Sequence, residues 1–121
     1  MSNPAEDCRG SAIVYHAGAI WLGYEIRSAV SVSIVVGSVI DDPEPIPVMM
    51  FVASTSYAGN LDLMLHSEKG HLWLTWVHGS EEVGWSEHDA ASDAWSAARF
   101  ESTIGASVDD ARDRIRAVVL E

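Results

Sequence analysis

The chain has 121 residues, which fits a single domain, and 48% of them are hydrophobic, which excludes a chain that is disordered throughout. It carries 18 acidic and 7 basic residues, for a net charge of −11. Such a charge repels phosphate, so direct binding of nucleic acid or of an anionic membrane is not expected.

The acidic charge has two interpretations. It favours a basic protein as partner, with an association that is fast and that weakens as salt increases. It also keeps a protein soluble, and many acidic proteins need no other reason for their charge. Composition alone leaves both interpretations open.

The N-terminal residues predict a flexible tail, 1–10, ahead of a single domain, 11–121. The tail is acidic and lacks the basic and apolar regions of a signal peptide. The single cysteine, Cys8, cannot form an internal disulfide, and the longest apolar stretch, 29–40, is too short to span a bilayer. These features predict a cytoplasmic protein.

The first predicted elements form a hairpin. Residues 11–16 and 19–26 are rich in β-branched and aromatic residues, so each predicts a strand. The Ala17-Gly18 pair between them predicts a tight turn.

The segment 28–40 is compatible with two structures. Alternate residues from Val30 to Val36 are apolar and β-branched, which favours a strand. Valines also recur at helical spacing, Ser28 is a possible N-cap, and the length of the segment favours a helix. The two are close on pattern alone, and our expectation of an earlier helix here depends on a family resemblance.

A meander is predicted from 48 to 86. Prolines at positions 43, 45 and 47 exclude a regular element just before it. Turn residues at 67–70 and from Gly79 onward separate segments that alternate between apolar and polar side chains. The predicted strands are 48–54, 61–66, 71–78 and 83–86.

The strand 71–78 has apolar residues on both faces, which predicts a central strand that is covered on each side. Trp73 and Trp76 are an odd number of residues apart, so they face opposite sides of the sheet. We expect one of them in the core and the other under a helix or at the surface.

The C-terminal part combines an ambiguous segment with a clear helix. Residues 89–99 are rich in alanine and ambiguous, and they are compatible with a helical turn or two, whereas 99–104 fits a final strand. The helix is predicted at 107–120, because Ser107 and Asp110 have the spacing of a capping box before an apolar stripe. The fold class predicted is α+β, an antiparallel sheet packed with a C-terminal helix and one earlier helix.

Motifs for catalysis or metal binding are absent from the sequence. The five histidines lack the close spacings of zinc sites, and His66 and His71, on either side of one turn, are the one candidate pair. Glu87 and His88 are adjacent on a strand and point to opposite faces, so they cannot form a dyad. There is no nucleophile elbow and no phosphate-binding loop. We therefore expect no enzyme, no cofactor and no metal.

The stretch 70–98 is the best candidate for a partner-binding surface. It has no Lys or Arg, and it interleaves five acidic residues with four tryptophans. Trp85 is the preferred interface anchor, because an aromatic anchor inside a charged rim is the usual anatomy of a tight interface. The predicted partner-binding residues are Glu81, Glu82, Trp85, Glu87, Asp89 and Asp93.

Several segments carry a family resemblance. Residues 61–76 (Leu-Asp-Leu-Met-Leu-His-Ser-Glu-Lys-Gly-His-Leu-Trp-Leu-Thr-Trp) give a strand, a charged turn with glycine and a second aromatic strand. Gly84-Trp85-Ser86, Phe100 and the cap from Ser107 to Asp110 follow in the same order. With these motifs, residues 28–120 resemble the first immunity family of bacterial polymorphic-toxin systems, which is often paired with deaminase toxins. That family usually has a helix before its first buried strand, which implies a helix at 28–40.

The resemblance implies an immunity-type inhibitor that occupies the active site or substrate groove of a nucleic-acid-acting toxin. Such a groove is basic because its substrate is anionic. Carboxylates of the inhibitor would replace phosphates, and arginine–carboxylate pairs would give the contact its direction. The family has no invariant catalytic set, so no residue role is carried over. The implied partner is the basic cognate toxin, and a monomeric inhibitor is favoured.

Two other classes of function remain open. One is a different acidic binder, such as a phage-encoded inhibitor of a defence nuclease, or a secretion chaperone. A chaperone would be a homodimer with an apolar groove, so its mass in solution would distinguish it. The other is a small enzyme or ligand-binding domain, which needs a pocket with converging polar groups. The His66/His71 turn and Glu87–Asp89 are the candidates for such a pocket.

Overall fold

The computed structural model describes residues 7–27, 31–39, 48–55, 61–79 and 81–121. This part of the chain has antiparallel strands and one helix, at the C-terminal end, so the predicted α+β class and C-terminal helix are confirmed. The elements are β1 (Asp7–His16), β2 (Ala19–Arg27), β3 (Val32–Val39), β4 (Val48–Thr55), β5 (Met64–Glu68), β6 (His71–His78), β7 (Glu82–Asp89), β8 (Ala94–Trp95), β9 (Arg99–Ser102) and α1 (Val108–Val119).

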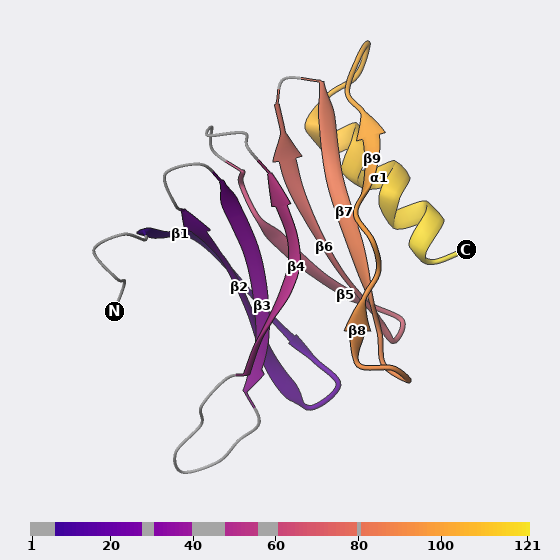
Figure 1. Cartoon of the computed structure of the whole chain (residues 1–121). Helices are drawn as coiled ribbons and strands as arrows, with labels where there is room; N and C mark the ends of the chain where they lie inside the picture. Colours follow the sequence, from indigo (N-terminus) through magenta and orange to yellow (C-terminus); the bar gives the residue numbers. More distant parts are fainter. Residues whose placement is uncertain (1–6, 28–30, 40–47, 56–60, 80) are drawn as a thin grey trace.

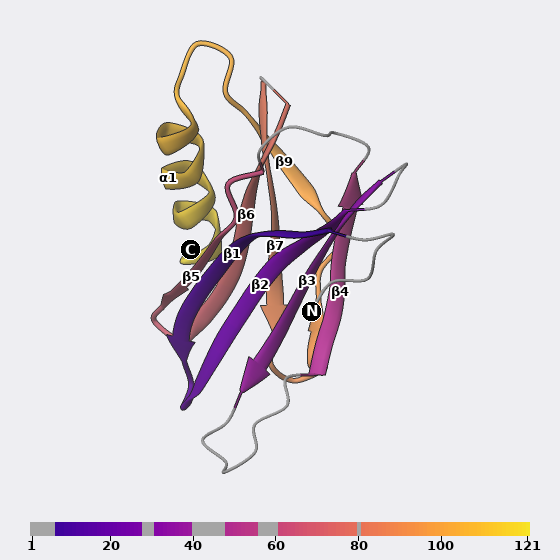
Figure 2. The same ribbon diagram turned by 90° about the vertical axis from the view of Figure 1, so that its left-hand side faces the viewer.

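The strands form two antiparallel sheets. The first sheet has the order β1-β2-β3-β4. The second has the order β5-β6-β7, and the short strands β8 and β9 both pair with β7, at its opposite ends. The sheets face each other, and α1 lies against the outer side of the second sheet (Figures 1 and 2). The described part of the molecule therefore has three layers, which are sheet, sheet and helix.

Each interface between layers has its own apolar core. Leu72, Leu74 and Trp76 of β6 face the first sheet and pack among its inward residues, such as Ile34. On the other face of the second sheet, Trp73 lies beneath the helix with the apolar residues Val83, Trp85, Ala111, Ile115 and Val119. The predictions that β6 is central and that its two tryptophans face opposite sides are confirmed.

Two hairpins have the turns that their residues predict. Ala17 and Gly18, between β1 and β2, have φ of 51° and 82°, and Lys69 and Gly70, between β5 and β6, have φ of 51° and 81°. Positive φ at both central positions is the turn type that matches the twist of two-residue hairpins, and glycine adopts it without steric cost.

The helix expected at 28–40 is wrong for residues 32–39, which form β3. Val32, Ile34 and Val36 are buried against the second sheet, and β3 is bonded to a strand on each side. β-Branched residues pack well on a pleated surface and lose side-chain freedom in a helix, so strand propensity prevails. Residues 28–30 and 40 lie outside the described residues, as does the predicted loop at 41–47.

Two other boundaries differ from expectation. Residues 7–10, expected in the tail, belong to β1, where Asp7 lies opposite Arg27 in the backbone register with β2. Residues 1–6 lie outside the described part. The predicted meander from 48 to 86 is divided between the sheets, because β4 pairs with β3 and the second sheet begins at β5. Consecutive strands were expected to be neighbours, but the connection after β4 passes from one sheet to the other.

The C-terminal helix follows the prediction closely. Ser107 is its N-cap, and its hydroxyl accepts from the Asp110 backbone N–H while the Asp110 carboxylate accepts from the Ser107 N–H. In the segment 89–99 the described residues form a turn and β8 and not a helical turn. Among the described helices, none is long and apolar enough to cross a membrane.

Candidate functional site

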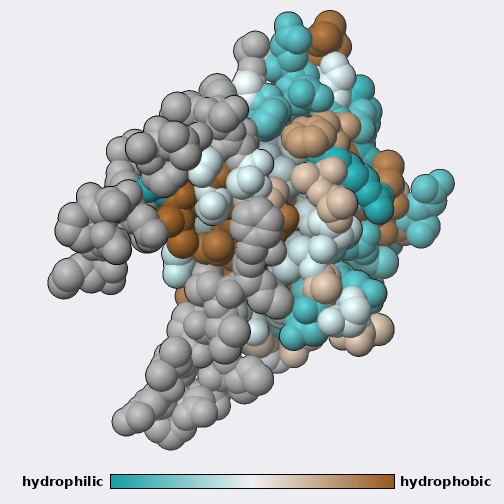
Figure 3. Space-filling view, in the orientation of Figure 1, coloured by the Kyte–Doolittle hydropathy of each residue, from teal (hydrophilic) through white to brown (hydrophobic). Residues whose placement is uncertain are grey.

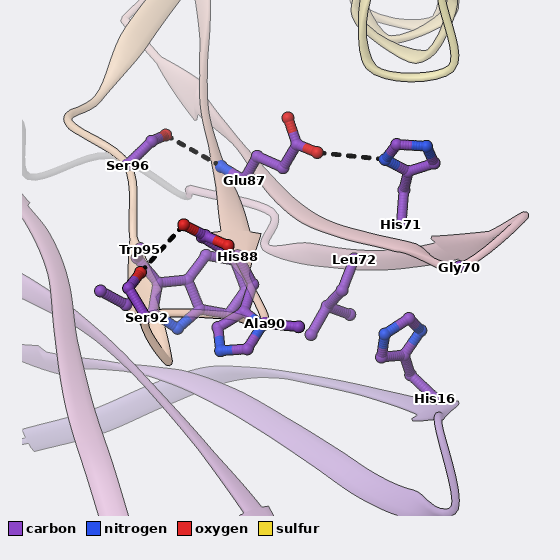
Figure 4. Close-up of a pocket in the computed structure, with 12 residues that line it drawn as sticks. His16, Gly70, His71, Leu72, Glu87, His88, Ala90, Ser92, Trp95 and Ser96 are labelled. Carbon is purple, nitrogen blue, oxygen red and sulfur yellow. Dashed lines mark hydrogen bonds and ion pairs between the residues drawn. The ribbon is translucent and has the colours of Figure 1, made fainter.

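The candidate site is a cavity of about 550 Å³ at one end of the two sheets. Three chain reversals meet there, namely β1–β2, β5–β6 and β7–β8 (Figures 1 and 4). The lining residues come from all three: His16, Gly70, His71, Leu72, Glu87, His88, Asp89, Ala90, Ser92, Ala94, Trp95 and Ser96. The cavity therefore exists only because the sheets pack with these hairpins at the same end.

One side of the cavity is aromatic. The ring of His88 lies 4.8 Å from that of Trp21 and 5.3 Å from that of Trp95, measured between centroids. The two indoles are themselves 6.4 Å apart and nearly perpendicular. His88 has only 6% of its side chain exposed, so this cluster is fixed by packing. The cluster holds the partly exposed Trp95 ring in place, and this ring can offer a π-face to a ligand without a further cost of ordering.

The His16 imidazole completes this side. The imidazole Nδ1 lies 2.6 Å from the Ser67 hydroxyl, and the backbone carbonyl of His16 accepts a hydrogen bond from the Trp21 indole. The Ser67 contact joins the β1–β2 hairpin to β5 of the second sheet. Burial, and secondarily His88, lower the pKa of His16 below its ordinary value, so this imidazole is neutral at neutral pH.

Two of the residues that line the cavity carry carboxylates. Glu87 is 34% exposed, and its Oε2 lies 3.2 Å from Nδ1 of His71. Asp89 accepts hydrogen bonds from the Ala91 N–H and the Ser92 hydroxyl, at 3.0 Å each. In Figure 4, His71 and Glu87 lie above the open space and His16, His88 and Trp95 lie below it. The Glu87 carboxylate and the aromatic group thus lie on opposite sides of the cavity (Figure 4).

A third carboxylate lies at the same end. Asp93 is 75% exposed and its Oδ1 lies 2.9 Å from Nε2 of His88, which connects the acidic and aromatic groups. Among the residues that the structure describes, none that lines the cavity is Lys or Arg. The nearest cation along the chain is Lys69, which precedes the lining residue Gly70. The site is therefore negatively charged where it opens to solvent.

The structure divides the six predicted partner-binding residues into three groups. Glu87, Asp89 and Asp93 lie together at the cavity. Glu81 and Glu82 are exposed at the opposite end of β7. Glu82 and Asp89 are seven residues apart, which corresponds to about 23 Å along the strand.

The expectation that Trp85 is an exposed anchor is wrong. This residue is 5% exposed and packs beneath α1, with the Arg99 guanidinium 4.9 Å from its ring. Glycine and acidic neighbours suggested exposure, but Trp85 points to the side of β7 that the helix covers. Burial under a helix depends on tertiary packing, which local composition does not encode.

The His66/His71 pair does not form a site. His66 stacks on Trp73 at 5.1 Å, and its Nε2 lies 2.9 Å from the Thr75 hydroxyl, whereas His71 pairs with Glu87. Burial, and secondarily Arg112, lower the pKa of His66 to about 4. Within the described ranges, no group of three or more His, Cys, Asp or Glu is arranged to hold a metal ion.

Sequence reasoning missed the aromatic half of the site. His16 and Trp21, of one hairpin, are far along the chain from His88 and Trp95, and only the packing of the two sheets brings the two pairs together. A weak signal was present, since His16 and His71 each flank a tight turn. The acidic half could be predicted from the sequence, because Glu87, Asp89 and Asp93 are close together in the chain.

No family model, no curated protein and no solved structure matches this chain. The function is therefore argued from the cavity and its charge.

Proposed function

We propose that this protein is an immunity-type inhibitor that binds and occludes a basic, nucleic-acid-acting protein such as a deaminase toxin. The observation that carries the proposal is the cavity end of the molecule. Three carboxylates, from Glu87, Asp89 and Asp93, lie there together, and no Lys or Arg lines the cavity.

The negative charge of this end complements the positive charge of a groove that binds nucleic acid. A groove that binds nucleic acid is lined by Lys and Arg, because it must neutralise phosphates. Carboxylates held at fixed positions can replace those phosphates and accept paired hydrogen bonds from arginine. The net charge of −11 steers the encounter over a longer range, and salt weakens that steering.

Binding fits this site better than catalysis does. The Glu87 and Asp93 carboxylates are each paired with an imidazole, and Asp89 is bonded within its own turn. Such pairing fixes the acidic groups in position, as an interface requires. The proposal therefore includes no catalytic residue and no cofactor.

The test is reconstitution with the product of the neighbouring gene, purified separately. We expect a 1:1 complex whose dissociation constant increases at least about tenfold between about 50 mM and about 300 mM salt. We also expect the complex to block the action of that product on nucleic acid. A product that is basic and active on nucleic acid but forms no complex at low salt would contradict the proposal.

A further inference from the structure

The charge of the site indicates a basic partner, and the volume of the cavity indicates that a chemical group of that partner can enter it. A volume of about 550 Å³ lies within the range of small-molecule sites, roughly 300–1,000 Å³. A chemical group can therefore enter between the hairpins and not merely contact the rim.

The two halves of the cavity select the charge and the form of that group. Fixed carboxylates at Glu87 and Asp89 favour a cation, and no lining Lys or Arg opposes it. Opposite Glu87 (Figure 4), the partly exposed Trp95 indole offers a flat face to a cation, which an indole attracts through its π-system. A group that uses both halves must be cationic, flat, and able to donate hydrogen bonds along its edge.

A guanidinium meets these requirements better than an ammonium does. It is planar, stacks on aromatic rings, and donates two parallel hydrogen bonds to one carboxylate. It is also hydrated more weakly than an ammonium, so it loses less on entering a partly enclosed cavity. Among the described residues, Oε1 of Glu87 accepts no hydrogen bond and remains for such a donor, since His71 contacts Oε2.

We propose that the cavity is a receptor for a guanidinium group, supplied by an arginine side chain of the basic partner. The proposal rests on the proposed function for the source of the guanidinium and on the cavity alone for its chemistry. A single arginine held between the lining carboxylates and the Trp95 ring would be a hot spot of the interface, as enclosed arginines commonly are.

The first experiment uses the isolated protein and two neutral-backbone probes. Nα-acetyl-arginine amide carries the guanidinium, and Nα-acetyl-citrulline amide has nearly the same shape without the charge. Each is titrated while the indole N–H signals are followed by NMR. We expect the arginine probe to shift the Trp95 signal and to bind at least about tenfold more tightly than the citrulline probe. Equal binding of the two probes, or no shift at Trp95, would overturn the proposal.

Matched variants then locate the site. Glu87→Gln and Asp89→Asn each remove one charge with little change in volume, and each should weaken the arginine probe about threefold to tenfold. Glu82→Gln removes the same charge at the other end of β7 and should leave binding unchanged. Lys69→Asn removes the nearest cation in the chain and should tighten binding. An equal loss in Glu82→Gln and Asp89→Asn would reduce the effect to net charge and overturn the assigned site.

The source of the guanidinium is tested in the complex with the neighbouring gene product. The double variant Glu87→Gln/Asp89→Asn should dissociate at least about tenfold faster than Glu82→Gln. If the double variant weakens the arginine probe but leaves the dissociation rate unchanged, the cavity binds a free guanidinium compound and the partner source is overturned.

The two proposals fail separately. If the complex forms but the arginine probe does not bind, the guanidinium site is overturned and the proposed inhibitor function stands. If the probe binds but no complex forms, the guanidinium site stands and the proposed inhibitor function is overturned. Melting curves of each variant exclude unfolding as the cause of a loss.

Discussion

Gly84 and Gly23 lie in strands of different sheets and differ in the space that a side chain would have. A β-carbon at Gly84 would lie 2.3 Å from the Trp76 indole, which covers this position from the paired strand β6. A β-carbon at Gly23 would lie 3.3 Å from a methyl group of Val36. Gly84 thus makes room for a buried ring, whereas Gly23 is only tightly packed.

Gly84→Ala should therefore destabilise the protein much more than Gly23→Ala. Trp76 is almost fully buried and cannot move without displacing the core between the sheets, so we expect a loss of about 2–4 kcal/mol. For Gly23→Ala we expect less than about 1 kcal/mol, because alanine also favours the folded strand over the unfolded chain. Urea unfolding measures both. Equal losses would mean that the indole adjusts freely.

The buried imidazole of His66 makes stability depend on pH. Its pKa is about 4 in the folded protein and 6.5 when unfolded, so the unfolded chain binds more protons between these values. Stability from this residue is fully present above about pH 6.5 and is lost as pH falls to about 4. The shift corresponds to a loss of about 3 kcal/mol at most, and partial exposure reduces it to about 1–2 kcal/mol.

His66→Gln tests this contribution, because glutamine cannot be protonated and can still bond Thr75. Between about pH 6.5 and pH 4, the free energy of unfolding should fall by about 1–2 kcal/mol more in the wild type than in the variant. Urea titrations at several pH values measure the two curves. Parallel curves would show that His66 does not account for the acid sensitivity.

At the scale of the element, the cap of α1 is the feature that sequence predicted most completely. Ser107 and Asp110 bond each other's backbone N–H groups, and the spacing alone identified both. Capping is local, so four consecutive residues contain the whole interaction. The strand β3 is the opposite case, since its pattern fitted a helix and a strand equally until the sheet on each side was known.

Ser107→Ala should remove this cap and destabilise the protein by about 1 kcal/mol. Ser107→Asp is the matched variant, because aspartate also accepts from the N–H of Asp110 and suits the positive end of the helix. It should retain most of the stability, although it lies beside two acidic residues. Thermal and urea unfolding compare the three proteins. If Ser107→Asp loses as much as Ser107→Ala, the hydroxyl stabilises the fold by some other contact.

At the scale of the whole molecule, the sequence predicted the charge of the binding surface but not its layout. The acidic residues near Glu81 and those near Asp89 are close in sequence and were expected to form one contact surface. An extended strand separates them, because each residue of β7 advances the chain by about 3.3 Å. The aromatic half of the cavity depends on contacts between sheets, which no local pattern contains.

This separation allows net charge to be distinguished from local recognition. The variant Asp89→Lys/Asp93→Lys and the variant Glu81→Lys/Glu82→Lys both replace two acidic residues by two lysines, so the net charge of each changes from −11 to −7. Steering by net charge alone would slow the association of both equally with the neighbouring gene product. If the cavity end is the interface, lysines there also repel the basic partner at contact.

We therefore expect the cavity-end variant to associate about tenfold or more slowly than the wild type at low salt, and the Glu81/Glu82 variant only about twofold to threefold more slowly. Stopped-flow association at several salt concentrations measures both, and melting curves confirm that both are folded. The difference should shrink as salt screens the charges. If the Glu81/Glu82 variant is the slower one, the interface lies at the opposite end of β7, and the cavity is not where the partner binds.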